Sequence, residues 1–258
     1  MSDTQRFHLQ SKEIHLGELW KEGKTKKLYK TSEEAWLFQE FKDSLTAFNA
    51  QKTGTFERKG ALNCVLTQSL FSLLESVGIP THYVSRVTDA GLVVQKLNMI
   101  PIEVVVRNYA AGSLCKRMGV PEKQHLESPL VEFFYKSDAL GDPLIGETHI
   151  YWWKWATPIE VAYMVGQALK ANSLFLDFFK SVGYLLADFK LEFGRNVENV
   201  ILLGDEMSLD NCRLWDLETG ESKDKDRFRF DYGQVKESYE EVAKRVQEAL
   251  QSNWRVTL

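Results

Sequence analysis

The stretch YLLADFKLEFG, residues 184–194, carries a charged side chain at every second position of an otherwise apolar segment. The charged residues are Asp188, Lys190 and Glu192. In an extended strand successive side chains point to opposite faces, so these three charges lie in one row with neighbours about 7 Å apart. The opposite face would contain Leu185, Ala187, Phe189, Leu191 and Phe193. The pattern therefore predicts a strand with one face in the core and one charged face, which is either solvated or part of a site.

A second strand is predicted directly after this one, because GRNVEN (194–199) separates it from the apolar residues 200–203. That strand leads into LLGDEMSLDNCRLWD (202–216), so Asp205 should come within about 5–8 Å of the charged row. Carboxylates on adjacent strands repel each other unless a cation lies between them. Mg²⁺ is commonly held by one or two carboxylates together with water and phosphate oxygens, and Lys190 would then neutralise a transferring phosphate. A ladder of solvated charges is the alternative at this point.

A basic turn near the N-terminus is a candidate phosphate cradle. The segment WKEGKTKKLYK (20–30) sets Lys24, Lys26 and Lys27 around Gly23, and glycine permits a tight turn with close backbone approach. The segment lacks the first glycine and the Lys-Ser/Thr ending of a Walker loop. A solvated hairpin tip would have the same composition, so the segment by itself leaves both interpretations open.

The segment IPIEVVVRNYAAGSLCKR (100–117) suggests an anion site. Glu103 and Arg107 lie on one side of a predicted strand whose other side is apolar. The small residues 110–113 follow and offer backbone N–H groups just before a short helix, an arrangement that binds anions. Arg107 would add a bidentate donor and Ser113 a hydroxyl group. A buried salt bridge between Glu103 and Arg107 is the alternative.

Two further segments add positive charge. Arg213 follows the acidic run 205–210. The segment SKDKDRFRF (222–230) is polar, and its basic residues include Lys225, Arg227 and Arg229. A loop of this composition is usually solvated. The aromatic segment HIYWWKWAT (149–157) is expected to pack in the core or at a subunit contact.

Hydrophobic periodicity predicts strands together with long helices. Helices are expected over residues 61–77, from Thr157 to about Ser181, and over about 233–250. Thr157-Pro158-Ile159-Glu160 begins the second helix with a capping residue, a proline in the first turn and a glutamate three residues after the cap. Short strands are expected at 83–87, 92–97 and 102–107. Strands mixed with segregated helices favour an α+β fold.

Composition narrows the functional class. The 258 residues are 44% hydrophobic and 26% charged, which is ordinary for a globular protein of one large domain or two lobes. The net charge of −4 gives no basic footprint for nucleic acid. The lack of a long apolar run predicts a protein without membrane segments, located in the cytoplasm. The three cysteines (Cys64, Cys115 and Cys212) form no CxxC pair, and the five histidines show no metal-ligand spacing.

Five segments, in this order, resemble the phosphoribosylaminoimidazole-succinocarboxamide synthase (SAICAR synthetase) family: EGKTKKLY, IPIEVVVRNYAAGS, LADFKLEFG, LGDEMSLDNCRLWD and DKDRFR. The resemblance implies an α+β fold of two lobes with antiparallel sheets and an ATP cleft between them, related to kinase and ATP-grasp architectures. The lobes would comprise residues 1–97, with the lysine-rich turn, and 98–258, with the Mg²⁺ and ribotide sites.

The resemblance also implies an activity and its ligands. ATP, carboxyaminoimidazole ribotide (CAIR) and L-aspartate would give ADP, phosphate and the succinocarboxamide SAICAR, through an acyl phosphate, in purine biosynthesis. The partners would then be small molecules, with Mg²⁺ as the cofactor and self-association left open. A small-molecule kinase on a related fold and a catalytically silent nucleotide-binding scaffold are the alternative functions.

Positions within the shared motifs imply roles for individual residues. The catalytic residues would be Lys190 and Asp188, and the Mg²⁺ ligands would be Glu192 and Asp205. The ATP contacts would be Lys24, Lys26 and Lys136, together with Lys96 and Leu97 in the segment VVQKLNM (93–99), the hinge between the lobes where adenine would pair with backbone. The substrate pocket would contain Arg107, Ser113, Asp210, Arg213, Lys225 and Arg229. Two positions depart from the family pattern: Leu209 stands where proline is usual, and Asn49 stands where many members carry aspartate.

Overall fold

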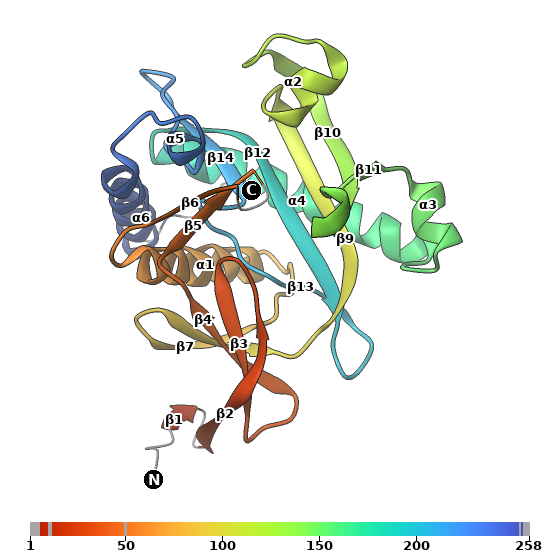
Figure 1. Cartoon of the computed structure of the whole chain (residues 1–258), viewed down its shortest axis with the longest axis vertical. Coiled ribbons are helices and arrows are strands. Elements are labelled where there is room, and N and C mark those ends of the chain that lie inside the picture. The colour runs from red at the N-terminus through yellow and green to blue at the C-terminus, as the bar shows by residue number, and fades with distance from the viewer. Residues whose placement is uncertain (1–5, 10–11, 49–50, 253, 255–258) are drawn as a thin grey trace.

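Two antiparallel six-stranded sheets form the framework of the protein in the computed structural model, which describes residues 6–9, 12–48, 51–252 and 254. The first sheet has the strand order β1-β2-β3-β4-β8-β7 and lies below and to the left of the second in Figure 1. Its strands are β1 (Arg6–Leu9), β2 (Lys12–Glu22), β3 (Lys26–Thr31), β4 (Trp36–Phe41), β7 (Tyr83–Thr88) and β8 (Gly91–Gln95). The α+β fold with antiparallel sheets is therefore confirmed.

The second sheet has the order β11-β10-β9-β12-β13. Its sixth strand, β14, also pairs with β12. Its strands are β9 (Asn98–Tyr109), β10 (His125–Tyr135), β11 (Leu144–Ile145), β12 (Tyr184–Arg195), β13 (Ile201–Leu203) and β14 (Cys212–Asp216). The predicted hairpin is present, since β12 pairs antiparallel with β13 and Phe193 lies opposite Leu203. A separate two-stranded ribbon consists of β5 (Ser44–Ala47) and β6 (Lys52–Thr55).

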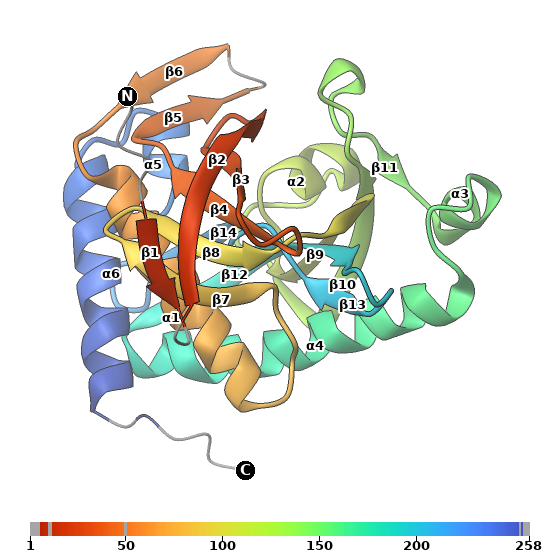
Figure 2. The same cartoon turned by 90° about the horizontal axis from the view of Figure 1, so that it is seen from below.

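The long helices cover the sheets. Helix α4 (Pro158–Ser181) crosses the second sheet against β9 and β12, as Figure 2 shows from below. Helix α1 (Lys59–Ser76) packs against the first sheet and also against α6 (Val235–Gln251), so a helix from the first quarter of the chain meets the last helix. The shorter helices are α2 (Ser113–Met118), η1 (Asp138–Leu140), α3 (Glu147–Trp152) and α5 (Asp226–Arg229). None of the helices in the described part of the chain combines the length and hydrophobicity needed to span a membrane.

Local sequence signals explain the start of α4. Thr157 accepts a hydrogen bond from the backbone N–H of Glu160, and the Glu160 carboxylate accepts one from the N–H of Thr157. This reciprocal pair is the predicted capping box, and it satisfies backbone donors that have no partner within the helix. Trp155 of the aromatic segment stacks on Tyr135, whereas Trp152 and Trp153 are exposed.

The central strand β12 contains a β-bulge that the alternation of its residues did not predict. Its pairing with β14 shifts between Leu186 and Asp188, so Ala187 is an extra residue on the β12 side. An extra residue reverses which face the preceding side chains occupy. The main core accordingly contains Tyr184, Leu186, Phe189, Leu191 and Phe193. The expectation that Leu185 and Ala187 share this face is wrong: both pack with Ala111 and Trp215 in a separate cluster.

Truncation of Phe189 tests the packing of this strand. The Phe189 ring is buried and meets the ring of Phe175 on α4 edge to face, with centroids 5.6 Å apart. Phe189→Ala should lower the free energy of unfolding by about 3–5 kcal/mol in a urea titration, because it leaves a cavity in the core. Ile159→Ala is the control, since that side chain is exposed, and its effect should stay within about 0.5 kcal/mol. Equal effects of the two changes would contradict this placement of β12.

Candidate active site

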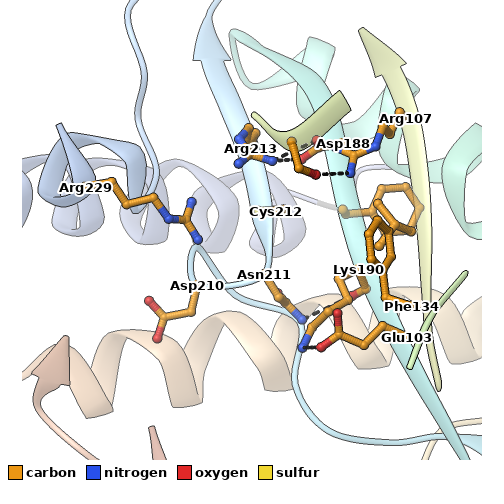
Figure 3. Close-up of a pocket in the computed structure, with 13 residues that line it drawn as sticks. Glu103, Arg107, Phe134, Asp188, Lys190, Asp210, Asn211, Cys212, Arg213 and Arg229 are labelled. Carbon is orange, nitrogen blue, oxygen red and sulfur yellow. Dashed lines mark hydrogen bonds and ion pairs between the residues drawn. The ribbon is translucent and has the colours of Figure 1, made fainter. Parts of the chain in front are cut away.

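Two adjoining cavities lie on the charged face of β12. The larger cavity has a volume of about 560 Å³ and extends from the β2–β3 turn to β12. The smaller cavity has a volume of about 280 Å³ and lies against β9, β12 and β14 (Figure 3). Four residues line both cavities: Glu103, Lys190, Asp210 and Asn211. We call these four residues the junction, because a group bound in one cavity meets a group bound in the other there.

The charged row of β12 is buried beneath these cavities. Asp188 and Glu192 are 3% and 2% exposed, so the solvated ladder of charges is wrong. Antiparallel pairing with β9 sets Asp188 opposite Arg107 and Glu192 opposite Glu103. Lys190 separates the two glutamates, and its ammonium group lies 2.8 Å from Glu103 Oε1 and 2.7 Å from Glu192 Oε1. Burial of unpaired charge is costly, so each of these groups needs its partner.

The lysines of the basic turn reach the larger cavity. Lys26 Nζ lies 2.7 Å from Asp205 Oδ1 and 3.0 Å from Glu206 Oε1. Burial alone would lower the pKa of Lys26, but the two carboxylates outweigh it and raise that pKa. Burial would likewise raise the pKa of Asp205, whereas Lys26 and Lys190 hold it below its usual range. Lys24 is more exposed and pairs with Asp138 at 2.6 Å.

The remaining expected ATP contacts differ in position. Lys136 forms an ion pair with Glu192, and Leu97 lines the larger cavity. Lys96 does not line it: its ammonium lies over the ring of Trp20, and its backbone N–H donates to the carbonyl of Ala35. The expectation for Lys96 concerned its backbone, so the position of its side chain on Trp20, a residue that lines the larger cavity, leaves that expectation open.

Four donors of the substrate-pocket set line the smaller cavity: Arg107, Ser113, Arg213 and Arg229. Arg107 donates through Nε to Glu132 at 2.7 Å and through Nη1 to Asp188 at 2.5 Å. Arg213 donates to both oxygens of Asp188, at 3.0 and 2.9 Å. Asp188 thus holds two guanidinium groups side by side, as Figure 3 shows. The alternative of a Glu103–Arg107 salt bridge is wrong, since Glu103 pairs with Lys190 and Arg107 with Glu132 and Asp188.

The turn before α2 brings backbone close to Arg213. Gly112 has a φ of 57° and a ψ of −122°, which side chains disfavour, and a Cβ there would lie 2.5 Å from Arg213 Nη2. The expected row of free backbone N–H groups is only partly available, because Ala110 donates its N–H to the carbonyl of Gln124. Arg107 Nη2 lies 3.4 Å from the hydroxyl of Ser113.

Asp210 stands at the junction within a set of donors from distant elements. Its Oδ2 accepts from Lys59 at 2.5 Å and from Asn63 at 3.0 Å, both on α1, and its Oδ1 accepts from Tyr239 of α6 at 2.9 Å. Lys225 lies farther away, 3.9 Å from Oδ1. The unusual Leu209 is buried just before Asp210, and its carbonyl accepts the N–H of Lys225. The other departure, Asn49, lies outside the described residues.

Sequence reasoning missed the residues that hold the site in place. The principal ones are Lys59, Glu132, Glu206, Asp226 and His82. Lys59 is fully buried, although nothing around it in the sequence distinguishes it from a solvated lysine before a helix. Asp226 is the most predictable, because it alternates with basic residues in the DKDRFR segment and binds both Arg213 and Arg229. His82 lines the larger cavity, and burial followed by repulsion from Lys26 lowers its pKa to about 3.

Glu192 and Asp205 have the chemistry of a Mg²⁺ site. The N–H of Gly204 donates to the carbonyl of Glu192, which sets Asp205 beside that strand end. Both carboxylates line the larger cavity. No cluster of three or more His, Cys, Asp or Glu ligands occurs among the described residues. Mg²⁺ needs no such cluster, because it takes one or two carboxylates and completes its shell with water and phosphate oxygens. The donor set therefore fits this ion.

The fold and the cavities together define a protein with two adjoining sites, each lined by cationic side chains, that share one charged junction. The model of the SAICAR synthetase family matches residues 19–246. The phosphoribosylaminoimidazole-succinocarboxamide synthase of Caldanaerobacter subterraneus is 49% identical over 90% of this chain and 98% of its own. The crystal structure of that synthase from Ehrlichia chaffeensis has a TM-score of 0.87 and 40% identity, and covers 89% of this chain and 98% of its own. A SAICAR synthetase solved in complex with ADP has a TM-score of 0.86 and 44% identity, with coverages of 89% and 97%.

This chain belongs to the SAICAR synthetase family. It is a ligase, and its reaction is the ATP-dependent ligation that this family performs in purine biosynthesis. Membership of this family decides against the small-molecule kinase.

Replacement of Gly112 tests the close approach to Arg213. Gly112→Ala should destabilise the protein by about 1–3 kcal/mol through backbone strain, and should raise the KM for the anionic substrate of the smaller cavity by displacing the guanidinium. Gly119→Ala is the matched control, because Gly119 also has a positive φ of 66° but nothing lies within 4 Å of its added Cβ. Urea unfolding and steady-state kinetics provide the readouts. An unchanged KM in Gly112→Ala would remove Arg213 from substrate binding.

Proposed function

We propose that the two cavities carry out this ligation by joining L-aspartate to the carboxylate of CAIR at the expense of ATP, with SAICAR, ADP and phosphate as the products. The observation that carries the proposal is the junction, where four residues line both cavities. A phosphate chain in the larger cavity and a carboxylate in the smaller one would meet beside Lys190. A volume of about 560 Å³ lies within the usual range for small-molecule sites.

The reaction needs an activated carboxylate. A carboxylate is a poor electrophile, so ATP would first transfer its γ-phosphoryl group to a CAIR carboxylate oxygen and release ADP. The aspartate amine would then attack the carbonyl carbon of the acyl phosphate, and phosphate would leave. Lys190 stands where both steps develop negative charge, and a fixed ammonium group in a buried site stabilises such charge strongly.

The larger cavity would hold ATP. Lys24, Lys26 and Lys136 would neutralise its phosphates, and Leu97 would contact the base. The ADP complex of the 44% identical relative supports a nucleotide in this fold. Lys96 would take part only through its backbone, since its side chain lies on Trp20.

Glu192 and Asp205 would hold Mg²⁺ beside the phosphates. The ion would supply positive charge to the transferring phosphoryl group. The two carboxylates also pair with Lys26, Lys136 and Lys190, so these lysines lie close to where the phosphate oxygens would bind.

The smaller cavity would bind the ribotide. Arg107, Arg213 and Arg229, with the hydroxyl of Ser113, would bind its phosphate, and Asp210 would bind the part nearest the junction. Asp188 would orient the two guanidinium groups, because Arg107 and Arg213 both donate hydrogen bonds to its carboxylate. Bidentate guanidinium groups suit a phosphate better than ammonium groups do.

The organisation of the chain is part of the proposal. A division into lobes at residues 97 and 98 is supported by the change from the first sheet to the second between Gln95 and Asn98. The need for ATP favours the cytoplasm. The exposed rings of Trp152 and Trp153 favour a contact between subunits in a homo-oligomer.

An assay of the complete reaction tests the function. Purified protein is mixed with ATP, Mg²⁺ and CAIR, with or without L-aspartate, and ADP and SAICAR are measured together. Both products should appear in equal amounts when all substrates are present. Binding of ATP without turnover would instead identify a catalytically silent scaffold.

Removal of the Glu192 charge tests the metal site. Glu192→Gln should lower kcat by at least about 100-fold while the protein stays folded, because the amide is a weaker ligand for a hard cation. Glu198→Gln, in the exposed turn after β12, is the control and should keep full activity. Activity is measured over a Mg²⁺ titration. If saturating Mg²⁺ leaves Glu192→Gln as active as the wild type, Glu192 is not a ligand.

Replacement of Arg107 by lysine tests the ribotide pocket. Arg107→Lys should raise the KM for CAIR far more than the KM for ATP, because a point charge cannot replace a planar bidentate donor. Circular dichroism checks that the variant is folded. Equal changes in the two KM values would assign Arg107 to the framework of the sheet.

A further inference from the structure

Lys225 differs from the other buried lysines of the site in its surroundings. Its side chain is 8% exposed and lines the larger cavity beside the junction. Lys26, Lys59 and Lys190 each have a carboxylate oxygen within 2.5 to 2.7 Å. Within the described part of the chain, the nearest carboxylate oxygen to Lys225 Nζ is Oδ1 of Asp210, 3.9 Å away.

The carboxylate of Asp210 is already hydrogen-bonded to other donors. Asp210 accepts hydrogen bonds from Lys59, Asn63 and Tyr239. Two oxygens bonded to three donors leave little negative charge for a fourth partner. Lys225 is therefore a buried amine whose protonated form is poorly compensated, which favours the neutral form.

Two of the charges that face Lys225 favour its neutral form, and two favour its protonated form. They come from Asp210 before β14, Arg229 on α5, Lys59 on α1 and, farther off, Glu206. Burial lowers the pKa of Lys225, Asp210 opposes this, and Arg229 and Lys59 lower it further, so the net pKa is below that of a free lysine.

The other titratable groups of the junction are poorer proton acceptors. Asp210 already accepts hydrogen bonds from Lys59, Asn63 and Tyr239, and the Lys190 ammonium group donates to Glu103 and Glu192. Glu103 has a pKa raised by burial, but it remains a carboxylate with one oxygen bonded to Lys190. Proton transfer from an ammonium group costs less free energy when the acceptor is an amine than when it is a carboxylate, because the pKa values of donor and acceptor are then closer.

We infer that Lys225 is the general base that takes a proton from the α-ammonium group of L-aspartate. The inference rests on the proposed ligation, in which only a neutral amine attacks the acyl phosphate. It deepens that proposal, because it assigns the proton transfer to one atom, Lys225 Nζ.

The step balances as follows. Neutral Lys225 Nζ accepts one proton from the aspartate ammonium, and the free amine forms a C–N bond to the acyl carbon. The C–O bond to phosphate then breaks, and the leaving phosphate carries away the second proton of the nitrogen as hydrogen phosphate. Lys225 afterwards releases its proton to water.

The primary experiment compares Lys225→Arg with the wild type. Arginine keeps the positive charge but does not accept a proton at neutral pH. The expected result is a fall in kcat/KM for L-aspartate of about 100-fold or more, with dissociation constants for ATP and CAIR within about threefold by calorimetry. Lys223→Arg is the matched control: Lys223 lies two residues away but pairs with Glu241, and its variant should behave as wild type.

The pH profile gives a readout that a structural role would not change. Lys225 is neutral above its pKa, so the wild-type kcat/KM for L-aspartate should rise with pH and then level off. In Lys225→Arg only the small fraction of neutral aspartate reacts, so the rate should keep rising about tenfold per pH unit up to the pKa of the substrate amine.

A rescue experiment distinguishes loss of the proton acceptor from loss of folding in the arginine variant. Lys225→Cys, in a Cys115→Ser background, is alkylated with 2-bromoethylamine to restore an amine of lower pKa than lysine. Activity should return, with the plateau of the profile moved to lower pH. Retained activity in Lys225→Arg, or an alkylated protein without activity, overturns the role of Lys225. A wild-type protein that forms no SAICAR overturns the proposed ligation itself, so the two failures are distinguishable.

Discussion

The burial of the charged row on β12 is the constraint on which the rest of the site depends. Asp188 and Glu192 are almost completely removed from water, and the desolvation of a carboxylate costs several kcal/mol unless cations and hydrogen-bond donors surround it. The fold supplies Arg107 and Arg213 to Asp188, and Lys136 and Lys190 to Glu192. The cations that compensate these buried carboxylates are also those that the proposed function assigns to anionic substrates.

The β-bulge at Ala187 makes this arrangement compatible with a packed core. Beyond the bulge the odd-numbered residues Phe189, Leu191 and Phe193 face α4, so the charges between them face the cavities. Before the bulge, Leu186 faces the core instead, and Leu185 packs towards the turn near Ala111. Strand β12 thus contributes residues to the main core on both sides of the bulge, while its charged side chains face the cavities.

The junction depends on contacts between parts of the chain that are far apart in sequence. Asp210 is held by Lys59 and Asn63 from α1 and by Tyr239 from α6. These donors saturate its oxygens, so within the described part of the chain Lys225 has no carboxylate oxygen closer than 3.9 Å, and this is the condition for an amine that gives up its proton. The electrostatics of the junction therefore follow from how α1 and α6 pack on each other.

The sequence by itself determined the antiparallel α+β class, the position of the long helices and the alternation of charge on β9 and β12, because these follow from local periodicity and capping. It also placed the charges of Lys26, Arg107, Lys190, Glu192 and Arg213 in recognisable motifs. Only the tertiary structure decided which carboxylate each cation contacts, and it excluded the alternative of a Glu103–Arg107 bridge, because the pairs are Glu103–Lys190 and Arg107–Asp188. It likewise revealed the buried Lys59 and the contact of the Lys96 ammonium group with the ring of Trp20. Strand register, bulges and helix packing set these pairings, and they depend on contacts between residues that are distant in the chain.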